Sequence, residues 1–552
     1  MKAKHLFHVL LTSVMLAATA GLTAACTSND DNPATPSGPS ESVIKKKIIG
    51  KWKAVMQDGK ERVTNRHAIM TFFADGTMTY TRSYYSDYWG IQIWANRAPY
   101  TYTVSDNLVT REGLEENGQM RKTFYEVNSI GNSEMEMALT GYVLDGQNYP
   151  IKQTNKYKHV TADYSEDIIG LWEATEMTGE QTYNDDNARL AFLTDGTYKY
   201  YRKSEAGEWQ LVSTRDVEEY FVDGDFVATR WQEKGGEMNY EWWDIDEIKD
   251  GQMKWSALRE REDGTRFTTT FTWKKVSDIA FLINEENFPD ATLREKLTTS
   301  VYGIKGDINR TYNYGDDGVI TTEELEKVVR LSIGYSDIEN YEGIELFTEL
   351  TQLTCPQTSI KTLDLKLPKL VTLDCSGSKL TKIDMSGCPE LKVLLCKYSN
   401  SLESIDLSKN TKLEYLECES CALTTLDVSK CTGLMTLNCS DNKLPTLDVS
   451  NLSKLETLTC TSNHMSALNV SGCPSFSFLD ISLNQFKGEA LDAVIANLPL
   501  KKELLGTLSV LNNAMGDYEQ NEITESQIAA ANAKGWTVYA GGKEYPGMLV
   551  NQ

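Results

Sequence analysis

The stretch Leu370-Val371-Thr372-Leu373-Asp374-Cys375 carries a pattern, LxxLxC, that decides how the second half of this chain folds. The pattern returns with small changes at residues 391–396, 413–418, 434–439, 455–460 and 476–481, and Cys355 begins the series. Neighbouring copies lie 20 to 22 residues apart. A fixed period of this length indicates that each copy is one coil of a solenoid, whose stacked coils bury a continuous core.

Other positions repeat with the same period and define the remaining walls of each coil. A third or fourth residue beyond each strand cysteine is expected to be buried and to bond the backbone of its own coil and the next; these residues are Ser378, Asn400, Cys421, Asn442, Asn463 and Asn484. A second column contains Cys388, Asn410, Cys431, Leu452 and Cys473. The return segments carry aspartates at 384, 406, 427 and 448, which indicate turns rather than a strip of metal ligands.

The cysteines of the repeats are predicted to form a buried, reduced ladder. Ten cysteines follow Cys26, all between 355 and 473. In a secreted chain they would ordinarily suggest disulfides, which stay open as the alternative. However, strand cysteines of successive coils stack about 4.8 Å apart with parallel side chains, which is a poor geometry for an S–S bond. A metal site is not expected, since only His67, His159 and His464 follow Cys26.

The leucines and the period are the signature of a leucine-rich-repeat solenoid, which we place at residues 349–486. In LxxLxC the leucines and the cysteine point inward, so the residues between them line the outer face of a sheet. Seven of these residues are the candidate contacts for a partner: Leu395, Tyr415, Glu417, Asn438, Thr459, Phe478 and Asp480. The alternative is that the apolar ones pack against a flanking domain.

Residues 278–348 and 487–552 are predicted to cap the two ends of the solenoid. Asp290 is expected to cap one helix, residues 489–495 and 526–533 read as two more helices, and residues 534–539 supply a closing strand. The segment 278–348 resembles the amino-terminal cap of internalin-like surface repeat proteins. That resemblance implies an α/β leucine-rich-repeat domain that recognises a protein or glycan at a cell surface.

A loop in the first cap, Gly315-Asp316-Asp317-Gly318, resembles an EF-hand or dockerin-type calcium loop. The resemblance implies Asp317 and Glu324 as oxygen donors, although Asn313 and Gly315 occupy the first and third ligand positions and depart from the motif. Thr321 and Glu324 also fit a capping box for a following helix. We therefore favour a turn and a cap without a cofactor, with bound Ca²⁺ as the alternative.

The front half of the chain contains one internal repeat, which predicts two antiparallel β-barrels at residues 43–160 and 161–277. Gly50-Lys51-Trp52 aligns with Gly170-Leu171-Trp172, and Asp75-Gly76 aligns with Asp195-Gly196 as a tight-hairpin signal. The Gly-x-Trp strand resembles lipocalin-like families, which implies a cup for a small apolar ligand. Alternatively, side chains fill the interior; the sequence does not say which of Trp231, Trp242, Trp243 and Trp255 point inward.

The N-terminal residues predict secretion and a lipid anchor. Residues 1–25 have the basic, apolar and small-residue regions of a cleaved signal peptide. Cys26, directly after Thr23-Ala24-Ala25, resembles the lipidated cysteine of a bacterial lipobox, although Leu22 lies one place further upstream than in the strictest form of that motif. Residues 26–42 carry three prolines and read as a solvated linker. We expect an outer-membrane protein that is held by its lipid alone and faces the cell exterior.

Charge and motifs narrow the function classes. A net charge of -24 argues against binding nucleic acid or anionic lipid surfaces. No G-x-S-x-G, H-E-x-x-H or phosphate-binding loop occurs, so we do not expect an enzyme. The hypothesis is a surface lipoprotein that binds a protein or glycan partner through its repeat face, in adhesion or ligand capture. The alternative is a carrier of a small apolar ligand in the barrels.

Overall fold

The computed structural model describes residues 38–545. Within this range it leaves out residues 67, 83, 87–90, 94–99, 115–117, 180–187, 206, 208, 213, 300–301, 503–505, 513–517 and 542. Cys26, the signal peptide and most of the linker therefore lie outside the described residues. The chain divides into two compact units. The first comprises Met1–Glu61, Ile69–Tyr80 and Asn96–His159, and the second comprises Arg62–Ala68, Thr81–Ala95 and Val160–Gln552.

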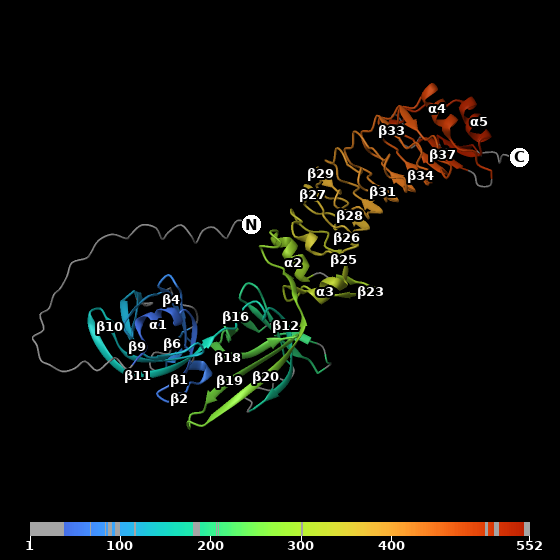
Figure 1. Cartoon of the computed structure of the whole chain (residues 1–552). Coiled ribbons are helices and arrows are strands. Elements are labelled where there is room, and N and C mark those ends of the chain that lie inside the picture. Colours follow the sequence, from blue (N-terminus) through green and yellow to red (C-terminus); the bar gives the residue numbers. More distant parts are fainter. Residues whose placement is uncertain are drawn as a thin grey trace, which may run out of the picture. The chain divides into compact units, whose positions relative to one another are not determined.

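The first barrel is an antiparallel meander that closes on itself. Its sheet has the order β11-β10-β9-β8-β7-β4-β3-β1-β2, and β11 also pairs with β1 (Figure 1). A short helix, α1 (Glu41–Lys47), precedes it. The strands are β1 (Gly50–Gln57), β2 (Lys60–Glu61), β3 (Ala68–Phe72), β4 (Thr77–Arg82), β7 (Tyr100–Ser105), β8 (Leu108–Leu114), β9 (Met120–Ile130), β10 (Glu134–Leu144) and β11 (Gln147–Val160). The segment between β1 and β7 also forms η1 (Thr64–Arg66), β5 (Tyr84–Ser86) and β6 (Ile91–Ile93).

The second barrel repeats this arrangement, with the sheet order β15-β14-β13-β12-β20-β19-β18-β17-β16. The sheet curls until Thr197 forms a bridge with Glu219, and Tyr220 N donates to Gly196 O at 2.9 Å. Its strands are β12 (Gly170–Thr178), β13 (Ala188–Phe192), β14 (Tyr198–Lys203), β15 (Trp209–Leu211), β16 (Arg215–Asp223), β17 (Phe226–Glu233), β18 (Met238–Lys249), β19 (Gln252–Glu260) and β20 (Arg266–Ser277).

The two copies of the Gly-x-Trp motif have the same strand pairing and the same hydrogen bond in the two barrels. Trp52 pairs with Met70 and Trp172 pairs with Leu190 in the same register. Both indoles are buried, and each Nε1 donates to the carbonyl four residues earlier, at 2.8 Å for Trp52 and 2.6 Å for Trp172. The glycine two residues before each tryptophan has a positive φ, 125° at Gly50 and 139° at Gly170. A residue with a side chain would be strained in this backbone conformation. Gly-x-Trp thus fixes the start of each barrel.

The segment before the repeats joins the solenoid sheet. Asp290 Oδ1 accepts a hydrogen bond from Leu293 N at 2.9 Å and caps the helix α2 (Ala291–Thr299), as predicted. The elements are β21 (Ile279–Leu282), α2 (Ala291–Thr299), β22 (Tyr302–Ile304), β23 (Asp307–Tyr312), β24 (Val319–Thr321), α3 (Thr322–Lys327), β25 (Val328–Ser332) and η2 (Ile344–Leu346). β25 pairs in parallel with the first repeat strand, so the core continues without a break into the repeats.

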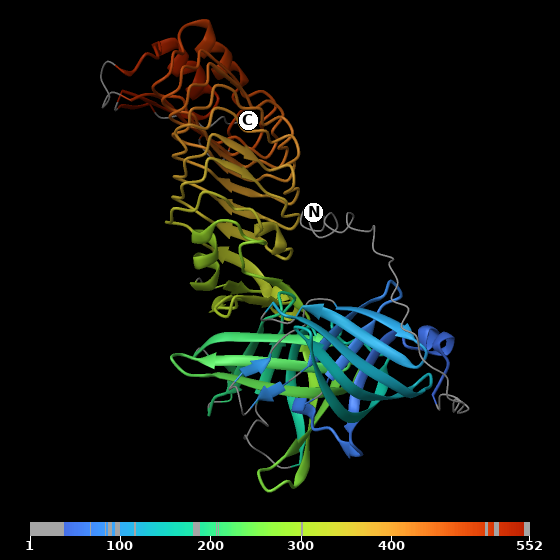
Figure 2. The ribbon, with the colours of Figure 1, turned by 90° about the vertical axis from the view of Figure 1, so that its left-hand side faces the viewer.

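The repeats are coils whose main strands pair in parallel, one per coil (Figure 2). Each strand has the burial pattern half-buried, buried, half-buried, because its central leucine faces the core. These strands are β26 (Gln352–Thr354), β28 (Thr372–Asp374), β30 (Val393–Leu395), β31 (Tyr415–Glu417), β32 (Thr436–Asn438), β34 (Thr457–Thr459) and β36 (Phe478–Asp480).

The expectation of an α/β solenoid is wrong within the repeats themselves. Residues 349–486 contain strands and turns but no helix. The return side instead carries two short parallel pairs: β27 (Thr362–Asp364) with β29 (Lys382–Asp384), and β33 (Thr446–Asp448) with β35 (Ala467–Asn469). The return segments alternate buried and less buried residues, as at Ile383, Asp384 and Met385, which suits extended backbone rather than a helix.

The sheet continues beyond the last repeat. The predicted helices appear as α4 (Glu489–Asn497) and α5 (Glu525–Ala533), and the predicted strand as β38 (Trp536–Ala540). The sequence analysis missed β37 (Gly506–Leu511), which pairs in parallel with both β36 and β38. A final strand, β39 (Lys543–Tyr545), turns back antiparallel. Among the described residues, no helix combines the length and apolar character needed to cross a bilayer.

Candidate binding surface of the solenoid

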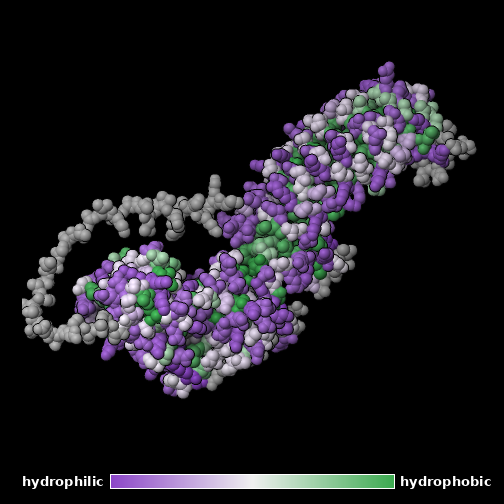
Figure 3. All heavy atoms as spheres, viewed as in Figure 1, coloured by the Kyte–Doolittle hydropathy of each residue, from purple (hydrophilic) through white to green (hydrophobic). Residues whose placement is uncertain are grey.

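The outer face of the parallel sheet presents two columns of half-buried side chains. Strand pairing places Tyr415 between Val393 and Thr436 in the first column, and Phe478 lies three coils beyond Tyr415 in the same column. It places Leu395, Glu417, Asn438, Thr459 and Asp480 consecutively in the second. All seven predicted contact residues therefore lie on one face, and each is partly exposed. In the view of Figure 3, hydrophobic residues of the solenoid form small areas among hydrophilic ones.

Two of the predicted polar contacts also stabilise the turn that follows their strand. Asn438 Oδ1 accepts from Ser440 N at 3.1 Å, and Asp480 Oδ1 accepts from Ser482 N at 3.0 Å. Glu417 forms an ion pair with Lys397, 3.1 Å apart. These side chains have structural partners within the chain, so substituting them tests folding as well as binding. The aromatic residues Tyr415 and Phe478 are the cleaner probes of the surface.

A further row of exposed or half-buried residues beside this sheet was missed by the sequence analysis. The third residue after each main strand has a positive φ, between 50° and 70°: Tyr335, Gln357, Gly377, Tyr398, Ser420, Asp441, Ser462 and Leu483. Tyr335 is 73% exposed and Tyr398 is 50% exposed, so both can reach a partner at the sheet. The left-handed backbone at each of these turns could have located the row, but only Gly377 and Asp441 belong to residue types that favour this conformation.

Buried asparagines in the core beneath the face are hydrogen-bonded to the backbone. Asn463 Nδ2 donates to Cys439 O and Cys460 O at 3.0 and 3.2 Å, and its Oδ1 accepts from Leu444 N at 3.0 Å. Asn442 and Asn484 bond in the same way. The predicted partner coil was wrong for the side chain, because each asparagine side chain bridges its own coil to the preceding one rather than to the next.

Asn400 does not belong to this asparagine column. It is exposed, and Ser399 takes the buried position three residues after Cys396. The coil between Cys396 and Cys418 is one residue longer than its neighbours, and the extra residue is accommodated after the column position. The sequence spacing left open whether the buried position lies three or four residues after the strand cysteine. In this coil the buried residue is the third.

The ten cysteines of the repeats are free and buried. Burial raises the pKa of the Cys439 thiol to about 12, and that of Cys431 to about 11. Cys421 differs: a hydrogen bond with the Cys396 side chain lowers its pKa. Several thiols lie within weak hydrogen-bond distance of a neighbouring coil, as Cys473 Sγ does at 3.2 Å from Val449 O. The ladder therefore fills the space between coils.

The return aspartates form turns. Asp384, Asp406, Asp427 and Asp448 each accept a hydrogen bond from the backbone N of the serine two residues later, at 2.8 to 2.9 Å. These bonds lower the pKa of each carboxyl. The side chains are thus committed to local backbone groups, as turn residues are.

The carboxylates of the calcium-like loop also have partners inside the chain. Thr321 and Glu324 form the predicted capping box of α3, with Glu324 Oε2 accepting from Thr321 N at 2.9 Å. Asp317 accepts from Val319 N at 2.7 Å and from the Tyr201 hydroxyl of the second barrel. Burial raises the pKa of Asp317 to about 6 and of Glu324 to about 7. Among the described residues, no group of three or more His, Cys, Asp or Glu is placed to hold a metal ion.

Comparisons with known proteins give structural similarity but no family. No family model and no curated protein matches the chain. The functional domain of InlJ from Listeria monocytogenes, described as including a cysteine ladder, is similar over 47% of this chain at 28% identity and a TM-score of 0.34. The match spans 56% of that domain, about half its length.

Two further structures are similar over smaller parts of the chain. Internalin C2 from Listeria monocytogenes covers 37% of this chain and 88% of its own at 22% identity, with a TM-score of 0.30. The leucine-rich-repeat domain of APL1B covers 38% and 63% at 19% identity, with a TM-score of 0.32. The class of the second half rests on its own geometry, because the period, the parallel sheet and the stacked leucines define a leucine-rich-repeat-like solenoid.

Proposed function

We propose that this protein binds a protein or glycan partner through the outer face of its parallel sheet. The observation that carries the proposal is the half-exposed aromatic and apolar trio Leu395, Tyr415 and Phe478, which lies on a sheet whose backbone is fixed by the coils beneath. A rigid surface loses little conformational entropy on binding, and aromatic anchors supply most of the energy at such interfaces. We propose a binding protein rather than an enzyme.

We further propose that the protein is secreted and anchored through Cys26 in the outer membrane, with its repeats toward the exterior. The support is the sequence of residues 1–26, whose last residue resembles a lipidated cysteine. Metabolic labelling with a fatty acid should mark the wild-type protein, whereas Cys26→Ala should be unlabelled and released from the membrane fraction. Labelling of Cys26→Ala would refute the anchor.

The binding face is tested by screening the full chain without its signal peptide against extracellular-matrix proteins and a glycan array. Tyr415→Ser and Phe478→Ser should each weaken the strongest interaction about tenfold or more, measured by surface plasmon resonance. Leu500→Ser is the matched control, since Leu500 is 60% exposed in the segment after α4 and outside the sheet. Equal affinities for all three variants and wild type would overturn the proposed face.

A carrier role for the barrels is the second candidate, because one observation favours it. The second barrel encloses a cavity of about 310 Å³, within the size range of small-ligand sites. All the residues around that cavity belong to the second barrel.

A further inference from the structure

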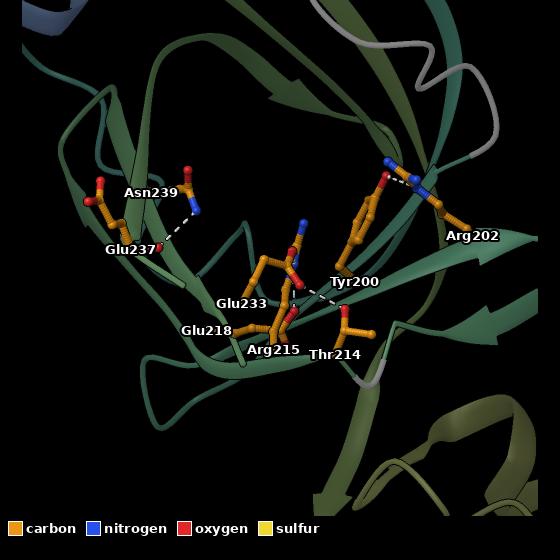
Figure 4. A network of polar contacts seen from close by, with 8 residues as sticks. All are labelled: Tyr200, Arg202, Thr214, Arg215, Glu218, Glu233, Glu237 and Asn239. Carbon is orange, nitrogen blue, oxygen red and sulfur yellow. Dashed lines mark hydrogen bonds and ion pairs between the residues drawn. The ribbon is translucent and has the colours of Figure 1, made fainter. Parts of the chain in front are cut away.

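Charged side chains around the cavity of the second barrel neutralise one another. Arg215 pairs with Glu218 at 3.4 Å and with Glu233 at 3.2 Å, and these three side chains converge in Figure 4. Arg202, whose Nε donates to the Tyr200 hydroxyl at 2.9 Å, adds a second positive charge beside them (Figure 4). Two positive and two negative groups therefore balance there. The outer face of the solenoid differs, because its charges do not balance.

The outer face of the parallel sheet from β26 to β36 carries an excess of carboxylates, and we call it the acidic face. It consists of the two outward residues of each main strand and the two residues that follow the next inward residue, which is a cysteine in all coils but the last. Five carboxylates and one lysine give it a net charge of -4: Asp374, Glu417, Glu419, Asp441, Asp480 and Lys397. The other eleven lysines and ten acidic residues of 349–486 lie elsewhere on the coils and nearly cancel. Negative charge is thus concentrated on the sheet.

Four of these five carboxylates have no opposite charge beside them. Lys397 pairs with Glu417 at 3.1 Å. In the described part of the chain, no lysine, arginine or histidine nitrogen lies within 4 Å of the other four, which are Asp374, Glu419, Asp441 and Asp480. Their hydrogen bonds come from neutral groups, such as Asn438 Nδ2, which donates to Glu419 at 3.0 Å. A neutral donor does not cancel the charge, so this charge remains available to a partner.

Apolar and aromatic side chains of the acidic face lie among these carboxylates. Leu395 is the register partner of Asp374 in the preceding coil and of Glu417 in the following one. Tyr415 lies two residues before Glu417 on the same strand, and Tyr398, in the turn after Leu395, is 50% exposed. Because neighbouring strands lie about 4.8 Å apart, a partner group resting on one of these side chains has a carboxylate within reach.

The single lysine of the acidic face shows which contact the surface offers to a cation. Lys397 Nζ lies 3.1 Å from the Glu417 carboxylate and 5.8 Å from the centre of the Tyr398 ring. Arginine suits this combination better than lysine, since its planar guanidinium stacks on a ring and pairs with a carboxylate through two parallel N–H bonds. An anionic glycan would be repelled by the same charges, and a neutral glycan would leave them uncompensated. The face therefore favours a basic protein segment.

We propose that the partner of the acidic face is an arginine-rich segment of a protein. The segment lies along the sheet, with side chains resting on Leu395 and Tyr415 and guanidinium groups pairing with the carboxylates of the neighbouring coils. From β28 to β36 the face is about 24 Å long, which corresponds to about seven extended residues. The inference rests on the proposed function, because it names the class of partner for the same face.

The test is fluorescence anisotropy of labelled nine-residue peptides with the full chain without its signal peptide. In the three peptides serine alternates with arginine, lysine or glutamate, and labelled heparin fragments and maltoheptaose are the glycan probes. The arginine peptide should bind saturably, the lysine peptide about threefold more weakly, and the glutamate peptide not at all. Raising NaCl from about 0.05 to about 0.5 M should weaken the arginine peptide about tenfold, because salt screens the carboxylates.

Matched variants separate the acidic face from the net charge of the whole chain. Glu419→Gln and Asp441→Asn each remove one negative charge and keep an oxygen acceptor, so both should fold and each should weaken the arginine peptide about threefold. The double variant should weaken it about tenfold. Glu403→Gln removes the same charge at an exposed residue outside the acidic face and should leave the affinity unchanged. Thermal melts of all variants check that they fold.

Two kinds of result would overturn the inference. One is the absence of saturable binding by the arginine peptide; the other is equal weakening by Glu403→Gln and Glu419→Gln, which would trace the attraction to net charge alone. If a glycan probe binds instead and Tyr415→Ser weakens it, the inference fails but the binding face of the proposed function stands. If Tyr415→Ser changes the affinity of no probe that binds, both fail.

Discussion

Single residues of the solenoid hold backbone conformations that their side chains disfavour. Ser420 has φ 52°, in the left-handed region, where a Cβ costs about 1–2 kcal/mol. Its N–H still donates to Ser440 O at 2.9 Å, so the stacking of coils holds the residue there. The same holds at Tyr398, with φ 61°. These turns store strain that the coil-to-coil hydrogen bonds offset.

Glycine should relieve this strain. We expect Ser420→Gly to raise the free energy of unfolding by about 0.5–1 kcal/mol in urea titrations, since glycine reaches positive φ without a steric penalty. The matched control is Thr424→Gly in the same coil, where φ is not positive, and it should lower stability by a similar amount. Equal destabilisation by the two substitutions would show that the backbone of Ser420 is not strained.

Cys421 should be the first thiol of the ladder to be alkylated. Its pKa is lowered by the Cys396 side chain while burial raises that of Cys439, so Cys421 holds more thiolate at any given pH. Iodoacetamide at pH 8 followed by peptide mass spectrometry should modify Cys421 before Cys439, and Cys421→Ser should remove the early product. Simultaneous modification of all thiols would indicate global unfolding instead.

At the scale of elements, the asparagine column ties each coil to the preceding one. Asn463→Ala removes bonds to Cys439 O, Cys460 O and Leu444 N and leaves these groups buried. We expect the free energy of unfolding to fall by about 2–4 kcal/mol.

Asn400→Ala is the control for this prediction. Asn400 lies near the corresponding position in its own coil but is exposed, so its substitution should change stability by less than about 0.5 kcal/mol. Chemical denaturation of both variants gives the comparison. A large loss in Asn400→Ala would place that residue in the column after all.

At the scale of the whole molecule, the second barrel meets the segment before the repeats through an apolar cluster and a buried acid. Ala191 and Leu193 of the barrel pack with Leu282 and Val319, and the Tyr201 hydroxyl donates to Asp317. Burial raises the pKa of Asp317 from 3.8 to about 6. The folded state therefore holds this proton more tightly than the unfolded state.

This contact should make stability depend on pH. An acid with a raised folded-state pKa stabilises fully below its unfolded pKa, and that stability is lost as pH rises through the folded value. We therefore expect the Tm to rise as pH falls from 7 to 5, and Asp317→Asn to reduce that rise. Glu323→Gln, at an exposed residue on α3 that pairs with Lys327, should not alter it. An unchanged slope in Asp317→Asn would rule out this carboxyl as a cause.

The sequence by itself determined the coils, because each repeat buries its leucines against an identical neighbour and the period of about 21 residues records that contact directly. It also determined the two barrels, through Gly-x-Trp and Asp-Gly, and one face for all seven candidate contacts. Only the tertiary structure decided that Ser399 replaces Asn400 in the column, that β37 extends the sheet, and that Trp255 and Trp273 share a cavity with Arg215. Those facts depend on packing between residues far apart in the chain, which leaves no periodic trace in the sequence.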